Sequence, residues 1–138
     1  SEINVVKQGM YNVTHGSMSW GTAHELKSFT PAIAGKTGTA QTFYYDPDNP
    51  NDTDPPETLT SSFVGYAPAN NPKVAVVVVF PNISTSADEA HYNTNVAQNI
   101  FKAYFQTIGV KTSSSSTSSS SSTTTTSSSS SSTTTTTN

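Results

Sequence analysis

The carboxyl-terminal stretch of the chain limits what the sequence can fold into more than any other feature. From residue 112 to residue 137 every position is serine or threonine, and the chain closes with Asn138. A segment without apolar side chains has nothing to bury against a core, so residues 111–138 are expected to form a disordered tail. Such tails are often O-glycosylated spacers, although an undecorated linker has the same composition. The preceding residues 1–110 suffice for one small domain with a modest core.

The composition argues against several classes of protein. The chain has no cysteine, so it can form neither a disulfide framework nor a thiolate metal site. All six basic residues are lysines, which argues against a nucleic-acid surface built on guanidinium groups. No apolar run reaches the roughly 18 residues of a membrane span, and no signal peptide is visible. His15, His24 and His91 lack metal-ligand spacing, so neither a metal nor another cofactor is expected.

Apolar spacing predicts a helix at the amino-terminal end. Four apolar residues recur at intervals of three and four: Ile3, Val6, Met10 and Val13. This spacing is typical of an amphipathic helix with one buried face, and Gly16 is placed to end it. A short helical or irregular piece is expected over residues 23–29. Trp20 should pack beneath this piece, because lone aromatic residues usually belong to a core or its cover.

Three strands are expected in consecutive order, over residues 33–43, 59–66 and 74–80. Connections rich in turn-forming residues separate them. The third run is unbroken, apolar and β-branched, which is typical of a central strand covered on both faces. The order predicts an antiparallel meander whose second hairpin is the tighter one.

A second long helix is expected after residue 81. Asn93 or Thr94 could cap its start, and Ser86 with Glu89 three residues later forms an alternative capping box. Gly109 is placed to end it. The helix should lie across one face of the sheet, which gives an α/β (α+β) fold with helices before and after three antiparallel strands. Its apolar stripe comprises Ala97, Ile100, Phe101, Tyr104, Phe105 and Ile108.

The connection between the first two strands is rich in proline and acid. Proline cannot donate to a strand ladder, so residues 44–58 are predicted to form a loop. The aspartate spacing invites a calcium interpretation, but Pro47 and Pro50 interrupt the stretch and the glycine of an EF-hand is absent. A solvated, mobile connection that gates a neighbouring cleft is the favoured interpretation. The loop holds five of the nine acidic residues: Asp46, Asp48, Asp52, Asp54 and Glu57.

The first predicted strand carries the residues with the clearest chemical potential. Side chains alternate along a strand, so Lys36 and Gly38 fall on one face and Thr37 and Thr39 on the other. The backbone of an edge strand can pair with an extended peptide, and an ammonium with hydroxyl donors suits a carboxylate. A peptide with a free carboxylate is therefore the predicted ligand class. A solvated lysine beside bulge glycines is the simpler interpretation of three residues alone.

A longer pattern surrounds these residues. Positions 34–41 are Ala-Gly-Lys-Thr-Gly-Thr-Ala-Gln, positions 61–68 are Ser-Ser-Phe-Val-Gly-Tyr-Ala-Pro, and positions 71–79 are Asn-Pro-Lys-Val-Ala-Val-Val-Val-Val. Lys-Thr-Gly is the third signature of penicillin-binding proteins and serine β-lactamases. In this order the runs resemble the carboxyl-terminal part of a class B penicillin-binding protein transpeptidase domain, from about residue 3 to residue 109. The resemblance implies the corresponding part of the serine β-lactamase/transpeptidase-like fold.

The resemblance also implies a reaction and its residues. The parent protein would be a D,D-transpeptidase that cross-links peptidoglycan stem peptides ending in D-Ala-D-Ala through a serine acyl-enzyme, which β-lactams also form. Lys36 would hydrogen-bond the serine of a Ser-x-Asn element, and Thr37 and Thr39 would bind the substrate carboxylate. Gly38 would let the acyl group approach the strand, and the N–H of Thr39 would form half of the oxyanion hole. Lys36 and Thr39 would thus be catalytic as well as substrate-binding.

Two signatures of the same family are absent from the sequence. The chain contains no Ser-x-x-Lys and no Ser-x-Asn, so the nucleophile and its base are expected upstream of Ser1 and the chain alone should be inactive. It would depend on the remainder of the domain, and without it would expose a sheet edge and aggregate. The resemblance further implies an extracytoplasmic protein, anchored in the membrane upstream of Ser1, in a Gram-positive cell that uses it for division or elongation.

Two other interpretations remain open. A β-lactamase or a β-lactam sensor shares the same strand, and fast deacylation of bound penicillin would favour the β-lactamase. A non-catalytic, wall-associated binding or adhesion module, in which the sheet carries a serine- and threonine-rich stalk, would explain the tail and the absent nucleophile. A start codon directly before Ser1 would favour this module.

Overall fold

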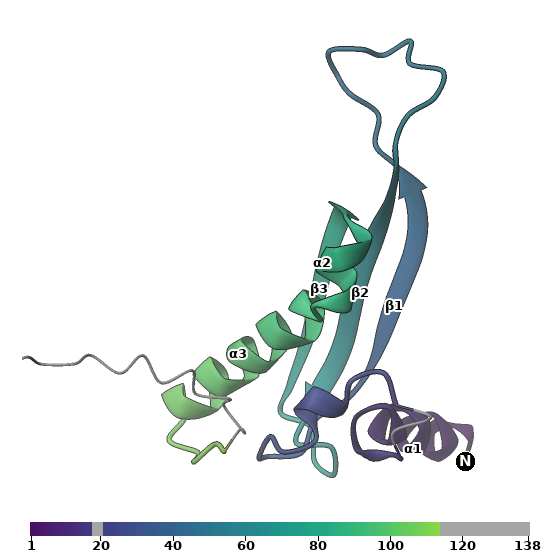
Figure 1. Cartoon of the computed structure of the whole chain (residues 1–138). Coiled ribbons are helices and arrows are strands. Elements are labelled where there is room, and N and C mark those ends of the chain that lie inside the picture. The colour runs from purple at the N-terminus through teal and green to yellow at the C-terminus, as the bar shows by residue number, and fades with distance from the viewer. Residues whose placement is uncertain (18–20, 114–138) are drawn as a thin grey trace, which may run out of the picture.

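The computed structural model describes residues 1–17 and 21–113. Trp20 and the tail beyond residue 113 lie outside the described residues. The packing predicted for Trp20 and the disorder predicted for the tail therefore stay predictions. None of the helices in the described ranges has both the length and the apolarity to cross a membrane. The elements follow the order α1 (Glu2–His15), the 3₁₀ turn η1 (His24–Leu26), β1 (Ala34–Phe43), β2 (Glu57–Ala67), β3 (Val74–Ile83), α2 (Thr85–Glu89) and α3 (Tyr92–Thr107) (Figure 1).

The three strands form the predicted antiparallel meander, and β2 is its central strand. In the register of β1 with β2, Thr37 lies opposite Phe63 and Thr39 opposite Ser61. Residues 44–56 connect β1 to β2, whereas residues 68–73 suffice between β2 and β3, so the second hairpin is the tighter one. The longer connection extends beyond the end of the sheet (Figure 1). β1 is therefore an edge strand of the described sheet.

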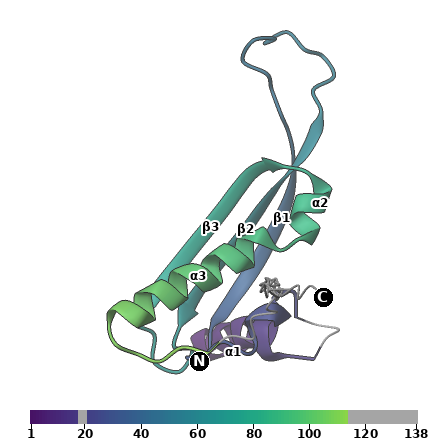
Figure 2. The ribbon, with the colours of Figure 1, turned by 60° about the vertical axis from the view of Figure 1, so that its left-hand side comes forward.

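Helix α3 covers one face of the sheet, and the core lies between the two (Figure 2). From the sheet, Phe63, Val76 and Val78 are buried. Ile100 and Ile108, which belong to the predicted stripe of this helix, are 42% and 49% exposed. Only part of the stripe therefore faces the sheet, although the predicted packing is confirmed. The other core residues are Ala23, Leu26, Phe29, Ile33, Ala67, Ala97, Phe101 and Phe105.

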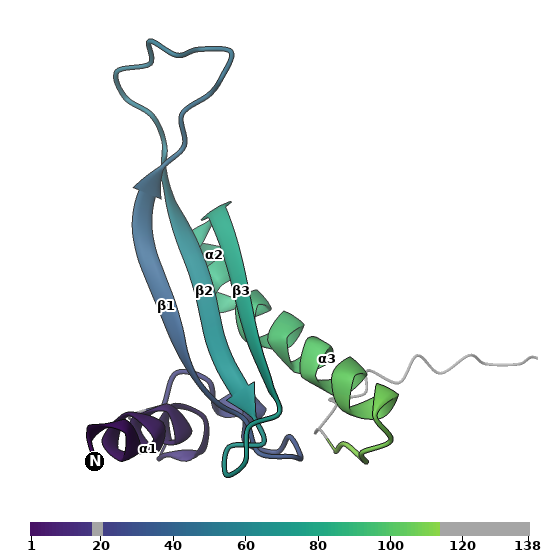
Figure 3. The same cartoon turned by 180° about the vertical axis from the view of Figure 1, so that it is seen from behind.

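Strand β3 differs from its prediction. Val77 and Val79 are 67% and 54% exposed, whereas Val76 and Val78 are buried. Successive side chains of a strand point to opposite faces, and in the described ranges no helix crosses β3 on the side of Val77 (Figure 3). The prediction of a central strand covered on both faces is therefore wrong for the described part of the chain, where β3 is the second edge of the sheet.

Two helices follow β3 in place of the single predicted one. His91 separates α2 from α3 and has a left-handed backbone (φ 54°). It occupies the N-cap position of α3 without a side-chain hydrogen bond, so the predicted caps at Asn93 and Thr94 are wrong. Ser86 is the second residue of α2 and does not precede it, so the alternative cap is wrong as well. The chain bends at His91 because a left-handed residue cannot continue a right-handed helix.

The two long helices end at the predicted glycines. The N–H of Gly16 donates to the carbonyl of Asn12 (2.8 Å). The N–H of Gly109, which has φ of 74°, donates to the carbonyl of Gln106 (3.1 Å). Glycine adopts this left-handed conformation without strain, which explains its place at the helix end.

Helix α1 lies at the end of the sheet where β1 begins (Figures 1 and 3). Val13 packs against the core, and the buried hydroxyl of Thr14 donates to the carbonyl of Ile33 (2.7 Å). Ile3 and Val6 are 65% and 61% exposed. The predicted helix is confirmed, but its predicted apolar face is buried only near the carboxyl-terminal end.

Candidate functional site on strand β1

The two threonine side chains of the Lys-Thr-Gly-Thr run face one small cavity. Its volume is about 210 Å³. Thr37 and Thr39 lie on one face of β1, because a single residue separates them. Thr37 lies opposite the buried Phe63, so this face is the one toward the core. The opposite wall comes from α2 and the start of α3. The lining residues are Thr22, Thr37, Thr39, Asp88, His91 and Asn93.

Both threonine hydroxyls have partners inside the molecule. The hydroxyl of Thr37 hydrogen-bonds the hydroxyl of Thr22. The hydroxyl of Thr39 donates to the carboxylate of Asp88, at 3.1 Å from Oδ2 and 3.4 Å from Oδ1. Thr37 and Thr39, for which a carboxylate ligand is predicted, therefore line the same cavity. Thr39 contacts a carboxylate of the protein itself, that of Asp88.

The Lys36 side chain lies on the other face of the strand. It is exposed, and its ammonium donates to the backbone carbonyl of Thr37. It does not line the cavity of Thr37 and Thr39. The structure therefore brings the two hydroxyls together, but it does not bring the ammonium to them.

Packing explains two of the three glycines around the site, Gly35 and Gly65. A β-carbon on Gly35 would lie 2.4 Å from Cζ of Phe63, and one on Gly65 would lie 2.6 Å from Cε1 of the same ring. A β-carbon on Gly38 would lie 2.7 Å from Oγ of Ser62, whose hydroxyl donates to the Gly38 carbonyl (3.2 Å). The buried ring thus excludes a side chain at Gly35 and Gly65, whereas the atom close to Gly38 is a hydroxyl that can rotate away.

Polar contacts join the elements that surround the cavity. His91 Nδ1 lies 3.6 Å from Oε1 of Glu25, and the hydroxyl of Thr94 donates to the same carboxylate. The Asn93 side chain donates to the carbonyl of Ser62 (2.9 Å). Sequence reasoning missed these residues because no spacing rule links η1, β2 and α3.

The acidic connection between β1 and β2 bonds to its own backbone. The N–H of Asp48 donates to the Asp46 carboxylate (2.9 Å), and the N–H of Asp54 donates to the Asp52 carboxylate (3.0 Å). These are the short-range contacts of aspartate in turns. Over residues 1–17 and 21–113, no group of three or more histidine, cysteine, aspartate or glutamate side chains is arranged to hold a metal ion.

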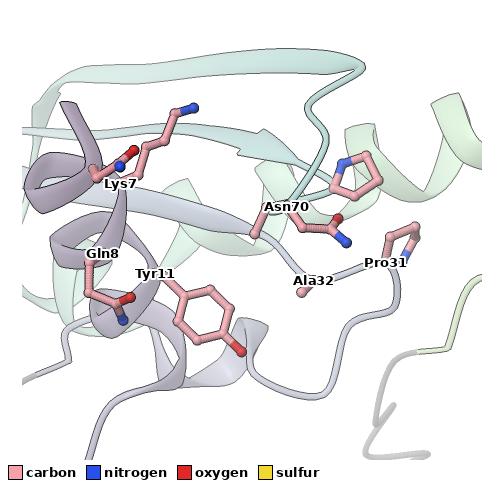
Figure 4. Close-up of a pocket in the computed structure, with 9 residues that line it drawn as sticks. Lys7, Gln8, Tyr11, Pro31, Ala32 and Asn70 are labelled. Carbon is pink, nitrogen blue, oxygen red and sulfur yellow. The ribbon is translucent and has the colours of Figure 1, made fainter. Parts of the chain in front are cut away.

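A larger cavity of about 710 Å³ lies between α1 and two proline-containing turns (Figure 4). The Tyr11 ring stacks on His15, with centroids 4.2 Å apart and planes 3° apart. Burial lowers the pKa of His15, and the charge of Lys27 lowers it further, while a hydrogen bond to the Tyr11 backbone opposes the change. No residue of the Lys-Thr-Gly run lines this cavity. Its lining comprises Asn4, Lys7, Gln8, Tyr11, Pro31, Ala32, Pro68, Ala69 and Asn70.

Comparison with known proteins defines the class. The family described as the penicillin binding protein transpeptidase domain matches residues 1–106, and the chain belongs to this family. It is 38% identical over 104 residues to Penicillin-binding protein H of Bacillus subtilis (strain 168), which covers 75% of this chain and 13% of that protein. It is 32% identical over 101 residues to Penicillin-binding protein 2B of Streptococcus pneumoniae serotype 2, which covers 72% of this chain and 12% of that protein.

The same class appears among solved structures. Penicillin-binding protein 2B from Streptococcus pneumoniae (strain R6) superposes with a TM-score of 0.65 and 27% sequence identity, over 80% of this chain and 16% of that one. The resemblance and the fold class inferred from the sequence are thereby confirmed. The chain spans about an eighth of the length of the curated relatives it matches.

Proposed function

We propose that this chain forms one wall of a D,D-transpeptidase active site that cross-links peptidoglycan stem peptides. Strand β1 would bind a peptide ending in D-Ala-D-Ala, or a β-lactam in its place. The observation that carries the proposal is the pair of hydroxyls, Thr37 and Thr39, which line one cavity on an edge strand of a transpeptidase family member. Hydroxyl donors beside a free strand edge suit a peptide carboxylate.

The chain would contribute binding and electrostatic stabilisation to the reaction. Thr37 and Thr39 would donate hydrogen bonds to the substrate carboxylate, and the Thr39 N–H would stabilise the oxyanion that forms when a serine attacks the D-alanyl carbonyl. Lys36 is exposed and its four-carbon side chain is flexible. Its ammonium would leave the Thr37 carbonyl to hydrogen-bond the serine of a Ser-x-Asn element supplied by another segment. Gly38 would leave room for the acyl group.

The nucleophile would come from a segment outside this chain. No Ser-x-x-Lys occurs in the sequence, and covalent catalysis needs the serine and its activating base together. The chain by itself is therefore expected to form no acyl-enzyme, and the rest of the transpeptidase domain is its proposed partner. An extracytoplasmic location at the membrane of a Gram-positive cell completes the proposal, and the relatives from Bacillus and Streptococcus support it.

The proposal is tested on membranes of the source cell. They are labelled with a reporter penicillin, the covalently labelled proteins are isolated, and their peptides are mapped by mass spectrometry. Peptides containing Lys36 are expected within a larger labelled protein, and prior treatment with an excess of unlabelled penicillin should prevent the labelling. If these peptides occur only in a short unlabelled protein, the transpeptidase proposal fails and a wall-binding module replaces it. Rapid loss of the label would indicate a β-lactamase instead.

A further inference from the structure

The hydroxyl of Thr39 has two possible partners, and one of them belongs to the protein itself. In the proposed function this hydroxyl donates to the substrate carboxylate. In the free chain it donates to Asp88, at 3.1 Å and 3.4 Å from the two carboxylate oxygens. A hydroxyl carries a single proton. The Asp88 carboxylate and a bound carboxylate therefore compete for the same donor.

The two carboxylates would also repel each other. Both would have to approach one hydroxyl within a cavity of about 210 Å³. The compensating cation is not close, because Lys36 lies on the opposite face of the strand. The cavity lining also includes His91, whose Nδ1 is 3.6 Å from the Glu25 carboxylate. This end of the cavity thus carries negative charge before any ligand arrives.

Asp88 is held by a short element that can yield. Helix α2 has five residues and is separated from α3 by the left-handed His91. Its backbone bonds near Asp88 are local, from the Asp88 N–H to the Ser84 carbonyl (3.2 Å) and from the His91 N–H to the Asp88 carbonyl (3.0 Å). The Asp88 side chain can therefore leave Thr39 without breaking the sheet.

We propose that Asp88 is a specificity-determining residue of this cavity. Its carboxylate accepts the hydrogen bond of the Thr39 hydroxyl until a ligand carboxylate displaces it. Because Asp88 repels further negative charge, the site favours peptide ligands with one negative charge over peptide ligands with two. This inference rests on the proposed function, because it assumes that a peptide carboxylate binds at Thr37 and Thr39. Asp88 acts on affinity and selectivity and takes no part in the covalent step.

The test compares charge variants of the full 138-residue chain. Amide NMR spectra follow Thr37 and Thr39 during titration with N-acetyl-D-alanyl-D-alanine, a monoanion, and with N-acetyl-D-alanyl-D-aspartate, a dianion. Asp88→Asn is expected to bind the monoanion roughly fivefold more tightly than the wild type, the size expected for removing one like charge at contact distance in water. The gain for the dianion should be larger. Asp54→Asn, which removes the same charge from the distant loop, should change neither affinity.

The outcomes separate the inference from the function on which it rests. If the wild type binds and Asp88→Asn binds both ligands with unchanged affinity, the inference is overturned. If no variant shifts Thr37 or Thr39 with either ligand, the proposed function is overturned together with it. Asp88→Ser provides a second neutral variant if Asp88→Asn loses the native spectrum. The methyl amide of N-acetyl-D-alanyl-D-alanine carries no charge. It should bind the wild type, Asp88→Asn and Asp54→Asn with equal affinity.

Discussion

A single aromatic ring lies over the backbone of the site strand and of its neighbour. Phe63 is 1% exposed, and its ring lies against the backbone of Gly35 on β1 and Gly65 on β2. Neither glycine has positive φ, so the absence of a side chain matters here through space and not through backbone freedom. A side chain at either glycine would therefore overlap the ring.

Gly35→Ala is expected to destabilise the fold. The new β-carbon would lie 2.4 Å from Cζ of Phe63 and 2.8 Å from the carbonyl oxygen of Val64. A backbone atom cannot move away as a flexible side chain can, so the overlap should lower the free energy of unfolding by about 1–3 kcal/mol. Urea denaturation measures the change.

Gly9→Ala is the matched control for this substitution. Gly9 lies inside α1 with nothing within 4 Å of an added β-carbon. Because alanine favours the helix over glycine, this variant should gain about 0.5–1 kcal/mol. Equal stability of Gly35→Ala and the wild type would show that the Phe63 contact does not constrain β1.

The sequence predicts single residues well where a periodicity applies and poorly where it does not. The shared face of Thr37 and Thr39 follows from the alternation of strand side chains. Asp88 reaches Thr39 from a segment far along the chain, and only the packing of α2 beside the sheet brings them together. The preference of Lys36 for the opposite face follows from the same alternation. The alternation therefore places the ammonium and the two hydroxyls on different faces of the strand.

At the scale of elements, α1 is attached to the domain through its last turn. Thr14 is fully buried, whereas Ile3 and Val6 are exposed. The spacing of apolar residues predicts a helix with one apolar face. It cannot predict how much of that face is buried, because burial depends on the surface against which the helix packs. The same holds for β3, whose valine run predicts a strand but not the presence of a cover on each side.

The stability of this attachment should depend on pH through His15. Its pKa lies below the usual 6.5, first because burial disfavours the charged ring and then because Lys27 repels it. The unfolded chain therefore binds the proton more readily than the folded one. Stability should be highest above about pH 6.5 and should fall as the pH drops below it.

Thermal unfolding between about pH 8 and pH 5 measures the effect. His15→Gln, which cannot be protonated, should show a weaker decline than the wild type across this range. His24 and His91 remain in both proteins and provide the common background. Identical pH profiles of the two proteins would contradict the assignment to His15.

At the scale of the whole molecule, one face of the sheet is apolar and exposed. Val64, Val77 and Val79 are 44%, 67% and 54% exposed, and Val64 lies opposite Val77 in the register. Neighbouring apolar side chains on an exposed sheet with two edges favour association between chains. The chain is therefore expected to self-associate in solution.

Val77→Thr with Val79→Thr should reduce this association and leave the thermal midpoint nearly unchanged. Both side chains are already in contact with water, so a hydroxyl there is solvated. Val78→Thr makes the same chemical change at a buried position and should destabilise the fold by about 1–3 kcal/mol. Light scattering measures the mass, and calorimetry measures the midpoint. An unchanged mass of the double variant would show that another surface drives association.

The unequal connections of the sheet also imply an order of assembly. β2 and β3 are joined across residues 68–73, whereas β1 and β2 are joined across residues 44–56. Closing a loop of about twice the length costs roughly 0.6 kcal/mol more in chain entropy, so the β2–β3 hairpin is expected to form first. Pulsed hydrogen exchange during refolding should protect the amides of β3 before those of β1. The strand that carries Thr37 and Thr39 would then be the last one added, and any early intermediate would lack the proposed carboxylate-binding face altogether.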